Sequence, residues 1–351
     1  MATTDNLSLG KKAETPNHQV PETTTPNCST DQISAEIWQR TEAQKIAGKL
    51  NAASGFSHDL MTADFENGLL ENPAHEIHDG VFHAESRLFI SEWFDPKLDG
   101  STGIVHGADF MHIISKLVEQ TTNSTIESVT EIRFSGVVQN EVDLFVSRGS
   151  TPKDIRKPVM TAQLYLKNGT DLYITAYDKP DKPITQRSAS NTFAQHLCVE
   201  PLTQHAAAIK WAQQNNKDFT APTNFEITLN PLPDNQKEAF NKFHNKNPIG
   251  FTASTALDIV ITGTQVLAYL GRAAGGISEE NSLGAGFSNV TLPPAEKLKT
   301  GCKLRLTVLN DRIRKTEKAE FWPIQFTFLD SDTNGNLGQG IFNWVNRTQI
   351  K

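Results

Sequence analysis

Apolar residues recur on one face of a long helix predicted within residues 103–118. They follow the i, i+3, i+4, i+7 spacing of an amphipathic helix and are Phe110, Ile113, Ile114, Leu117 and Val118. Met111 widens the apolar face beyond this stripe. Such breadth predicts a helix that is enclosed by a sheet.

Stretches rich in β-forming residues follow this helix and predict antiparallel strands. They span residues 129–138, 142–147, 159–166 and 173–177. Asn168-Gly169 precedes the last of them and suits the positive φ of a tight hairpin turn. This part of the chain therefore reads as one helix followed by an antiparallel sheet.

The same order of elements returns later in the chain. A second apolar helix is predicted for residues 255–273 and is followed by the stop signal Gly275-Gly276. Further strands are predicted at 283–292, 302–309, 319–329 and 340–346, with Asn334-Gly335 at the last turn. The repetition predicts an α+β chain in which one unit is used twice, as in a fused pseudo-dimer.

Polar and turn-forming stretches set the boundaries between the predicted units. We expect a disordered leader (1–30), a first unit (31–180), a connector (181–220) and a second unit (221–351). Helices are predicted for Thr30–Leu50 at the start of the first unit and for Thr203–Gln214 in the connector. The second unit opens with a strand at 224–229 and an amphipathic stretch at 235–244.

Composition excludes several classes of protein. The 351 residues are 37% hydrophobic and 21% charged, with no apolar run of the ~20 residues that a membrane helix needs. Cys28, Cys198 and Cys302 are odd in number and far apart, which argues against a disulfide framework or a zinc site and favours a cytoplasmic protein without a secretion signal.

The formal net charge of −7 disfavours binding to nucleic acid, which depends on Lys and Arg side chains. Basic residues nevertheless gather in one predicted hairpin, where a solvated strand end or a contact with an acidic partner would explain them. They are Arg312, Arg314, Lys315 and Lys318.

Several segments carry a resemblance to hot-dog proteins, in which a curved antiparallel sheet wraps a long helix. Ile132-Arg-Phe-Ser-Gly-Val-Val138, Ala256–Gly276 with its Tyr269-Leu-Gly271, and Leu283-Gly-Ala-Gly286 resemble the bacterial 3-hydroxydecanoyl-ACP dehydratase. Gly103-Ile-Val-His-Gly107 is similar to the helix start of MaoC-type hydratases. The resemblance covers residues 80–178 and 224–348 and implies a tandem, double hot-dog fold, known from fused dehydratase domains of polyketide and polyunsaturated fatty acid synthases.

The resemblance implies a base and an acid contributed by opposite hot dogs. In the dehydratase pattern a His precedes the acid of the central helix by 14 residues, and His244 and Asp258 have that spacing. His244 would then face the acid of the first helix, for which Asp109 is the candidate. Asp95 occupies the corresponding position before Asp109, so the site of Asp258 would lack its base and be degenerate.

Other readings of these residues remain open. Fused dehydratases usually hold the His in the first half and the acid in the second, the reverse of this pairing. Aligning Gly107 with the glycine of the family's helix start moves the first acid position to His112 and makes His106 and His112 candidates. Aligning Tyr269-Leu-Gly271 moves the second acid position to Val260. Asp258 is explained as well by an N-cap role as by catalysis.

The implied activity is dehydration of 3-hydroxyacyl thioesters, presented by acyl carrier protein or as acyl-CoA. Backbone amides at a helix start, near Ala253 or Gly107, would hold the enolate oxygen. No cofactor is implied, no nucleotide, metal or nucleophile-elbow motif is present in the sequence, and a homodimer of double hot dogs is possible. A non-catalytic acyl-binding or carrier-binding module and an acyl thioesterase are the alternatives.

Overall fold

The structure is a computed structural model of the chain. It describes residues 70, 72–86, 90–91, 107–108, 110–136, 138–149, 156–184, 187–188, 192–215, 223–273 and 282–347. The predicted leader, the predicted Thr30–Leu50 helix and the Gly275-Gly276 stop signal lie outside these residues.

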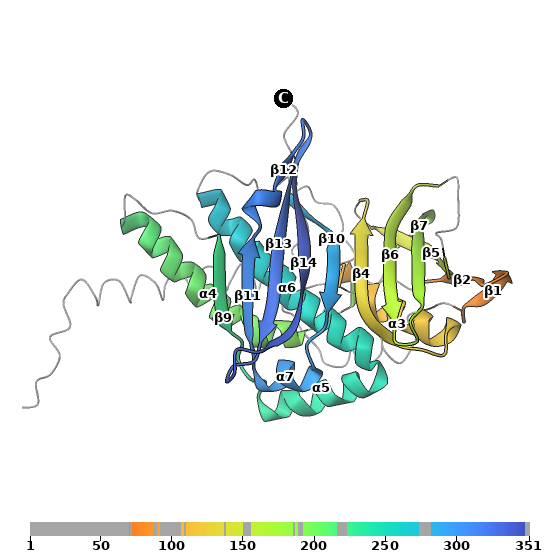
Figure 1. Cartoon of the computed structure of the whole chain (residues 1–351), viewed down its shortest axis with the longest axis horizontal. Coiled ribbons are helices and arrows are strands. Elements are labelled where there is room, and N and C mark those ends of the chain that lie inside the picture. The colour runs from red at the N-terminus through yellow and green to blue at the C-terminus, as the bar shows by residue number, and fades with distance from the viewer. Residues whose placement is uncertain are drawn as a thin grey trace, which may run out of the picture.

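One antiparallel sheet runs through both halves of the molecule (Figure 1). Its first half is ordered β1-β2-β5-β7-β6-β4 and its second half β10-β14-β13-β11-β9. The two halves join where β4 pairs with β10, with Ile132 opposite Phe287 and Val129 opposite Val290. The predicted double hot-dog fold is confirmed by this arrangement of helices and sheet.

The first half places its central helix, α3, between two strands at its start and the four strands that follow. The elements are β1 (His75–His78), β2 (Val81–Glu85), α3 (Phe110–Thr121), β4 (Ile126–Phe134), β5 (Asn140–Ser147), β6 (Pro158–Leu166) and β7 (Asp171–Pro183). A separate parallel pair joins β3 (Ile90–Ser91) to β8 (Arg187–Ser188). All four strands predicted for this unit are present.

The second half has a longer central helix and the same sequence of strands. The elements are β9 (Asn224–Thr228), α5 (Asp234–Lys246), α6 (Pro248–Ala273), β10 (Ser282–Thr291), α7 (Ala295–Thr300), β11 (Lys303–Val308), η1 (Asn310–Arg312), β12 (Arg314–Lys315), β13 (Ala319–Leu329) and β14 (Asn336–Arg347). Helix α6 begins seven residues before the predicted start at Thr255.

The last two strands of each half form a hairpin, and the two hairpins occupy their sheet positions in opposite order. In the second half β13 lies beside β11 and β14 beside β10, whereas in the first half β7 lies beside β5 and β6 beside β4. Because β5 and β6 are both antiparallel to β7, they run parallel to each other. The order of elements along the chain therefore repeats, but their order in the sheet does not.

Both predicted hairpin turns are confirmed. Gly169 has φ of 81°, and its N–H donates to the carbonyl oxygen of Leu166 at 2.8 Å. Asn334 has φ of 56°, and Asp330 Oδ1 accepts hydrogen bonds from the N–H groups of the turn. An Asn or Gly at these positions avoids the cost that a Cβ-branched side chain would meet at positive φ.

Helix α4 (Thr192–Asn215) is longer than the predicted Thr203–Gln214 because it continues through Pro201. A proline lacks the N–H that would bond to the carbonyl four residues earlier, here that of Leu197. The backbone N–H of Asn230 donates to this carbonyl oxygen at 2.9 Å. A group outside the helix thus replaces the missing bond and ties α4 to the segment after β9.

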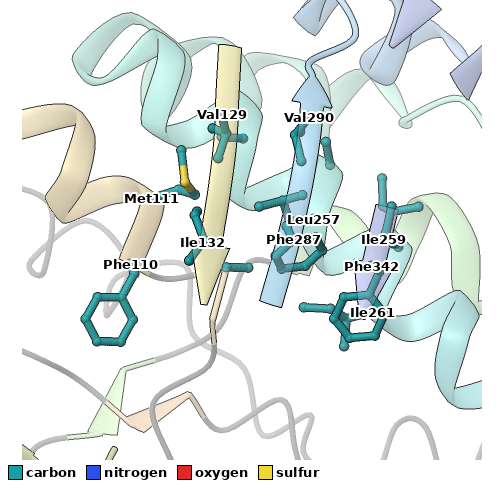
Figure 2. Packing of buried hydrophobic residues seen from close by; sticks show 14 of the residues in the cluster. Phe110, Met111, Val129, Ile132, Leu257, Ile259, Ile261, Phe287, Val290 and Phe342 are labelled. Carbon is teal, nitrogen blue, oxygen red and sulfur yellow. The ribbon is translucent and has the colours of Figure 1, made fainter. Parts of the chain in front are cut away.

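The buried apolar residues form one cluster that spans the join between the halves (Figure 2). Phe110 and Met111 come from α3, and Leu257 from α6, while Ile132 and Phe287 come from the joined strands. The rings of Phe287 and Phe342 lie 4.9 Å apart between their centroids. In the described part of the chain, no helix is long and apolar enough to cross a membrane.

Gly286 is required at the join between the halves. Its φ is 148°, and a Cβ there would overlap the carbonyl oxygen of Ile132 on β4. We expect Gly286→Ala to lower the free energy of unfolding by more than about 3 kcal/mol, from backbone strain and displacement of β4. Urea unfolding followed by circular dichroism measures the change. Gly136→Ala is the control, because nothing lies within 4 Å of its added Cβ; equal losses in both variants would contradict the argument.

Candidate active site

Helix α6 packs against both α3 and α4. Asn247 contacts Ser115 of α3, and Phe251, one turn further along α6, faces His112 of α3. Contacts therefore move backward along α3 as α6 proceeds, so the two central helices are antiparallel. The following turns of α6 continue toward the N-terminal end of α3.

Asn247 is a buried polar link between the two central helices. Its Oδ1 accepts a hydrogen bond from Ser115 Oγ at 2.6 Å and from the N–H of Gly250 at 3.2 Å. Its Nδ2 donates to the carbonyl oxygen of His112 at 3.3 Å. The Asn247 side chain thus caps the start of α6 and fixes α6 against α3.

Asp258 is a buried carboxyl in the middle of α6. Its side chain is 5% exposed, and burial raises its pKa well above the usual range because the charged form is poorly solvated there. Thr262, one turn later, donates its hydroxyl hydrogen to the Asp258 backbone carbonyl at 2.8 Å. Burial therefore favours the protonated form of the carboxyl, which is the form that can donate a proton.

Cys198 of α4 lies beside Asp258. Burial raises the pKa of the Cys198 thiol, the nearby Asp258 raises it further, and a hydrogen bond with Thr262 partly opposes these effects. The thiol is therefore protonated near neutral pH and is not a nucleophile. Helix α4 covers the face of α6 that carries Asp258.

His112 is a buried neutral histidine on α3. It is 8% exposed, and burial lowers its pKa from 6.5 to about 3. Its ring lies 6.5 Å from that of Phe251 between centroids. At neutral pH this imidazole is uncharged and is a weak base.

His244 lies in the last turn of α5, two residues before the helix ends. Its ring stacks on Phe240, with 6.3 Å between centroids and 11° between planes. Phe240 in turn packs against Phe251 of α6. The half-buried His244 is thus held near the start of α6 by an aromatic cluster, while its predicted partner Asp109 lies outside the described residues.

Two expectations for the second helix are wrong. Asp258 is not an N-cap, because α6 begins at Pro248 and the carboxyl lies three turns into the helix. Ala253 is not at a helix start: it is fully buried inside α6, whose first amides are capped by Asn247. The predicted start at Thr255 is too late because the helix extends back to Pro248, where the Asn247 side chain caps it.

The remaining predicted residues have different outcomes. Gly107 is described, and a Cβ there would come within 2.8 Å of the Phe134 ring, so the backbone approaches β4 closely at the N-terminal end of α3. Its role as an oxyanion site stays a prediction, and His106 lies outside the described residues. Val260 is a fully buried core residue.

Sequence reasoning missed the neighbours that α4 supplies to Asp258. Pro201 disfavours a helix that continues through it, so the part of α4 that carries Cys198 is not predicted. Apolar residues at Phe193, Leu197 and Leu202 were the available signal, since all are fully buried. Among the described residues, no group of three His, Cys, Asp or Glu side chains is arranged to hold a metal ion.

Comparisons with known proteins find similar structures but no similar sequences. No family model and no curated protein matches the sequence. The dehydratase domain of the polyketide PpsC from Mycobacterium tuberculosis is 10% identical, with 80% of this chain and 98% of that chain covered and a TM-score of 0.41. An N-terminal dehydratase from the difficidin assembly line is 11% identical over 78% and 96%, with a TM-score of 0.39.

A third similar structure carries another name. It is a protein from Novosphingobium aromaticivorans that is named a putative thioesterase, 10% identical over 79% of this chain and 99% of that chain, with a TM-score of 0.34. At these identities and scores, the similar structures indicate no activity for this chain.

The buried Asp258 carboxyl should make the protein less stable as pH rises. Above the ordinary carboxyl pKa of 3.8 the unfolded chain loses this proton while the folded chain keeps it, so folding becomes less favourable with increasing pH. We expect Asp258→Asn to raise the urea midpoint at pH 7 and to leave it nearly unchanged near pH 3. Asp171→Asn, at an exposed carboxyl, is the control; a lower midpoint for Asp258→Asn at pH 7 would contradict the assignment.

Removing the Asn247 side chain should loosen the contact between the central helices. Asn247→Ala leaves the Ser115 hydroxyl and the His112 carbonyl without this partner, so we expect a loss of about 3 kcal/mol in the free energy of unfolding. Ser115→Ala removes one hydrogen bond and should cost about 1 kcal/mol. Chemical unfolding of both variants measures the difference, and equal costs would show that Asn247 acts only through Ser115.

Proposed function

We propose that this chain removes water from 3-hydroxyacyl thioesters, with Asp258 as the acid that protonates the departing hydroxyl. The supporting observation is the burial of the Asp258 carboxyl on the central helix of the second hot dog, which raises its pKa. A hydroxyl leaves readily only when it is protonated, and a general acid must carry its proton at the working pH. Burial raises the pKa of Asp258 and so favours the protonated form that this role requires.

The direction of the two central helices supports this choice of acid. Beyond Phe251, α6 proceeds toward the N-terminal end of α3, where Gly107 and Ala108 lie. A helix N-terminus favours negative charge, as on the enolate oxygen formed when a thioester loses its α-proton. An acid from the second half also agrees with the resemblance, since fused dehydratases usually hold the His in the first half and the acid in the second.

The reaction needs a base in addition to Asp258. The base takes the proton from C2 of the substrate, the electron pair moves toward the thioester carbonyl, and the C3–O bond breaks as Asp258 transfers its proton to the hydroxyl. The products are a 2-enoyl thioester and water, and the proton on the base returns to Asp258 before the next turnover. We propose His106 as the base that acts with Asp258. In the alternative arrangement His244 is the base and Asp109 the acid, and the experiment below distinguishes the two.

The burial of Asp258 favours dehydration over thioester hydrolysis. A thioesterase on this fold needs an ionised carboxylate that removes a proton from water. Burial raises the pKa of the Asp258 carboxyl and so disfavours the ionised form that this role requires. Release of free thiol from the substrate would indicate hydrolysis.

A non-catalytic acyl-binding module is the second candidate function. It is favoured by one observation: Asp258 is only 5% exposed and lies beside Cys198 of the covering helix α4. In that case the chain would bind a 2-enoyl or 3-hydroxyacyl thioester without converting it. Equilibrium binding measured beside turnover separates the two functions.

Substitution of the two candidate acid–base groups tests the proposal. We expect Asp258→Asn to lower kcat for dehydration of 3-hydroxybutyryl thioester by about 100-fold or more, because the amide cannot donate the proton. His244→Ala should retain activity if Asp258 is the acid. Absorbance of the enoyl thioester measures the rate, and the retained fold of Asp258→Asn is verified by its unfolding curve.

The opposite pattern would replace the assignment. Full activity in Asp258→Asn with loss in His244→Ala would favour the pairing of His244 with Asp109. Thioester binding without turnover in the unaltered protein would establish the non-catalytic module.

A further inference from the structure

The hairpin that connects β11 to β13 exposes three cations outside ion pairs. Arg312, Arg314 and Lys318 are exposed, and none of them forms an ion pair within the described part of the chain. The fourth cation, Lys315, binds Glu320 at 2.8 Å. Asp311 and Glu317 are the acidic residues that remain on the hairpin outside ion pairs.

Many cations elsewhere in the second half are already neutralised by carboxylates. Arg305 binds Glu226 at 2.7 Å, and Lys299 binds Glu296 at 2.7 Å. Lys297 is paired with Asp330, and Lys237 with Asp234. The exposed guanidinium groups of the hairpin are therefore an unusual concentration of available positive charge in this half.

An exposed aromatic side chain accompanies these cations. Phe321 is 40% exposed and lies directly opposite Arg314 in the β12–β13 pair. Residues directly opposite in an antiparallel pair project from the same face of the sheet. Arginine and aromatic side chains together are typical of the energetically dominant part of protein interfaces.

The hairpin also projects from the body of the sheet. In Figure 1 the blue hairpin of β12 and β13 extends past the ends of β10 and β11, close to the C-terminal end of the chain. A partner can approach such a projection without meeting the neighbouring strands. We call Arg312, Arg314, Lys318 and Phe321 the hairpin patch.

We propose that the hairpin patch docks an acidic carrier protein that delivers the thioester to this chain. The inference deepens the proposed function, on which it rests for the nature of the cargo. The formal net charge of −7 repels an acidic partner from the chain as a whole, so local positive charge would direct it to this hairpin. Phe321 supplies apolar contact area beside Arg314.

The composition of the hairpin patch favours a protein partner over a phosphate polymer or a membrane. Three free cations beside two free carboxylates are few for binding the regular phosphates of nucleic acid. One partly exposed phenylalanine also gives little apolar area for insertion into lipid. An acidic protein surface with a small apolar contact matches both components.

The test compares one acyl group on two carriers. The probes are 3-hydroxybutyryl thioester on an acidic acyl carrier protein and the same acid as its N-acetylcysteamine thioester. For Arg312→Glu/Arg314→Glu we expect KM for the protein-bound substrate to rise about tenfold, with the KM and kcat of the small thioester unchanged. Added salt should raise KM for the protein-bound substrate in the unaltered chain and less so in the variant.

Lys157→Glu/Lys167→Glu is the matched control, because it reverses two exposed cations of the first half. An equal rise in KM for this control would show an effect of net charge and would overturn the proposal. Unchanged KM for both substrates in the hairpin variant would overturn it as well.

Binding without chemistry separates this inference from the proposed function. If the unaltered chain turns over neither substrate, the dehydratase proposal fails, and anisotropy of the labelled carrier protein then decides the docking. Weaker carrier binding in the hairpin variant than in the control supports the hairpin patch; equal binding overturns it. Preferential loss of binding to a single-stranded RNA or to phosphatidylserine vesicles would assign the surface to those partners instead.

Discussion

The pairing of β4 with β10 is the constraint on which the rest of the molecule depends. Backbone hydrogen bonds across this pair make two sheets into one, and the close approach at Gly286 leaves no room for a side chain between Gly286 and the Ile132 carbonyl. Once the strands are joined, the two central helices meet. Residues of α3 and α6, among them Leu257 of α6, then share one core with Ile132 of β4 and Phe287 of β10. The relative position of every residue in the candidate site follows from this join.

Within that shared core, polar side chains have two different energetic roles. Asn247 satisfies its hydrogen-bonding groups with atoms of both helices, so its burial stabilises the contact. Burial raises the pKa of Asp258, so this group makes folding less favourable as the pH rises. A side chain that makes folding less favourable but is suited to proton donation is expected at positions where function, rather than stability, determines the residue.

Local patterns in the sequence predicted the elements well because each leaves a signal within a few residues. The helical spacing around Phe110, the alternation along β13 and the turn residues at Gly169 and Asn334 are of this kind. Pro201 misled the prediction of α4, because the Asn230 N–H that replaces its missing bond comes from a distant segment. The burial of Asp258 and His112, the cap from Asn247 and the inverted order of β6 and β7 likewise depend on tertiary contacts, and no local pattern encodes them.

Because the last hairpin is inverted, strand pairs can form at different times in the two halves while the chain is synthesised on the ribosome. In the first half β4 pairs with β6, so Ile132 meets Ala162 soon after both emerge, and the sheet is complete once β7 has been made. In the second half β10 pairs with β14, so Phe287 can meet Phe342 only after β14, the last strand, has been synthesised. The strand that joins the halves therefore has a finished neighbour on one side long before it gains one on the other, and the first hot dog can serve as the template on which the second is assembled.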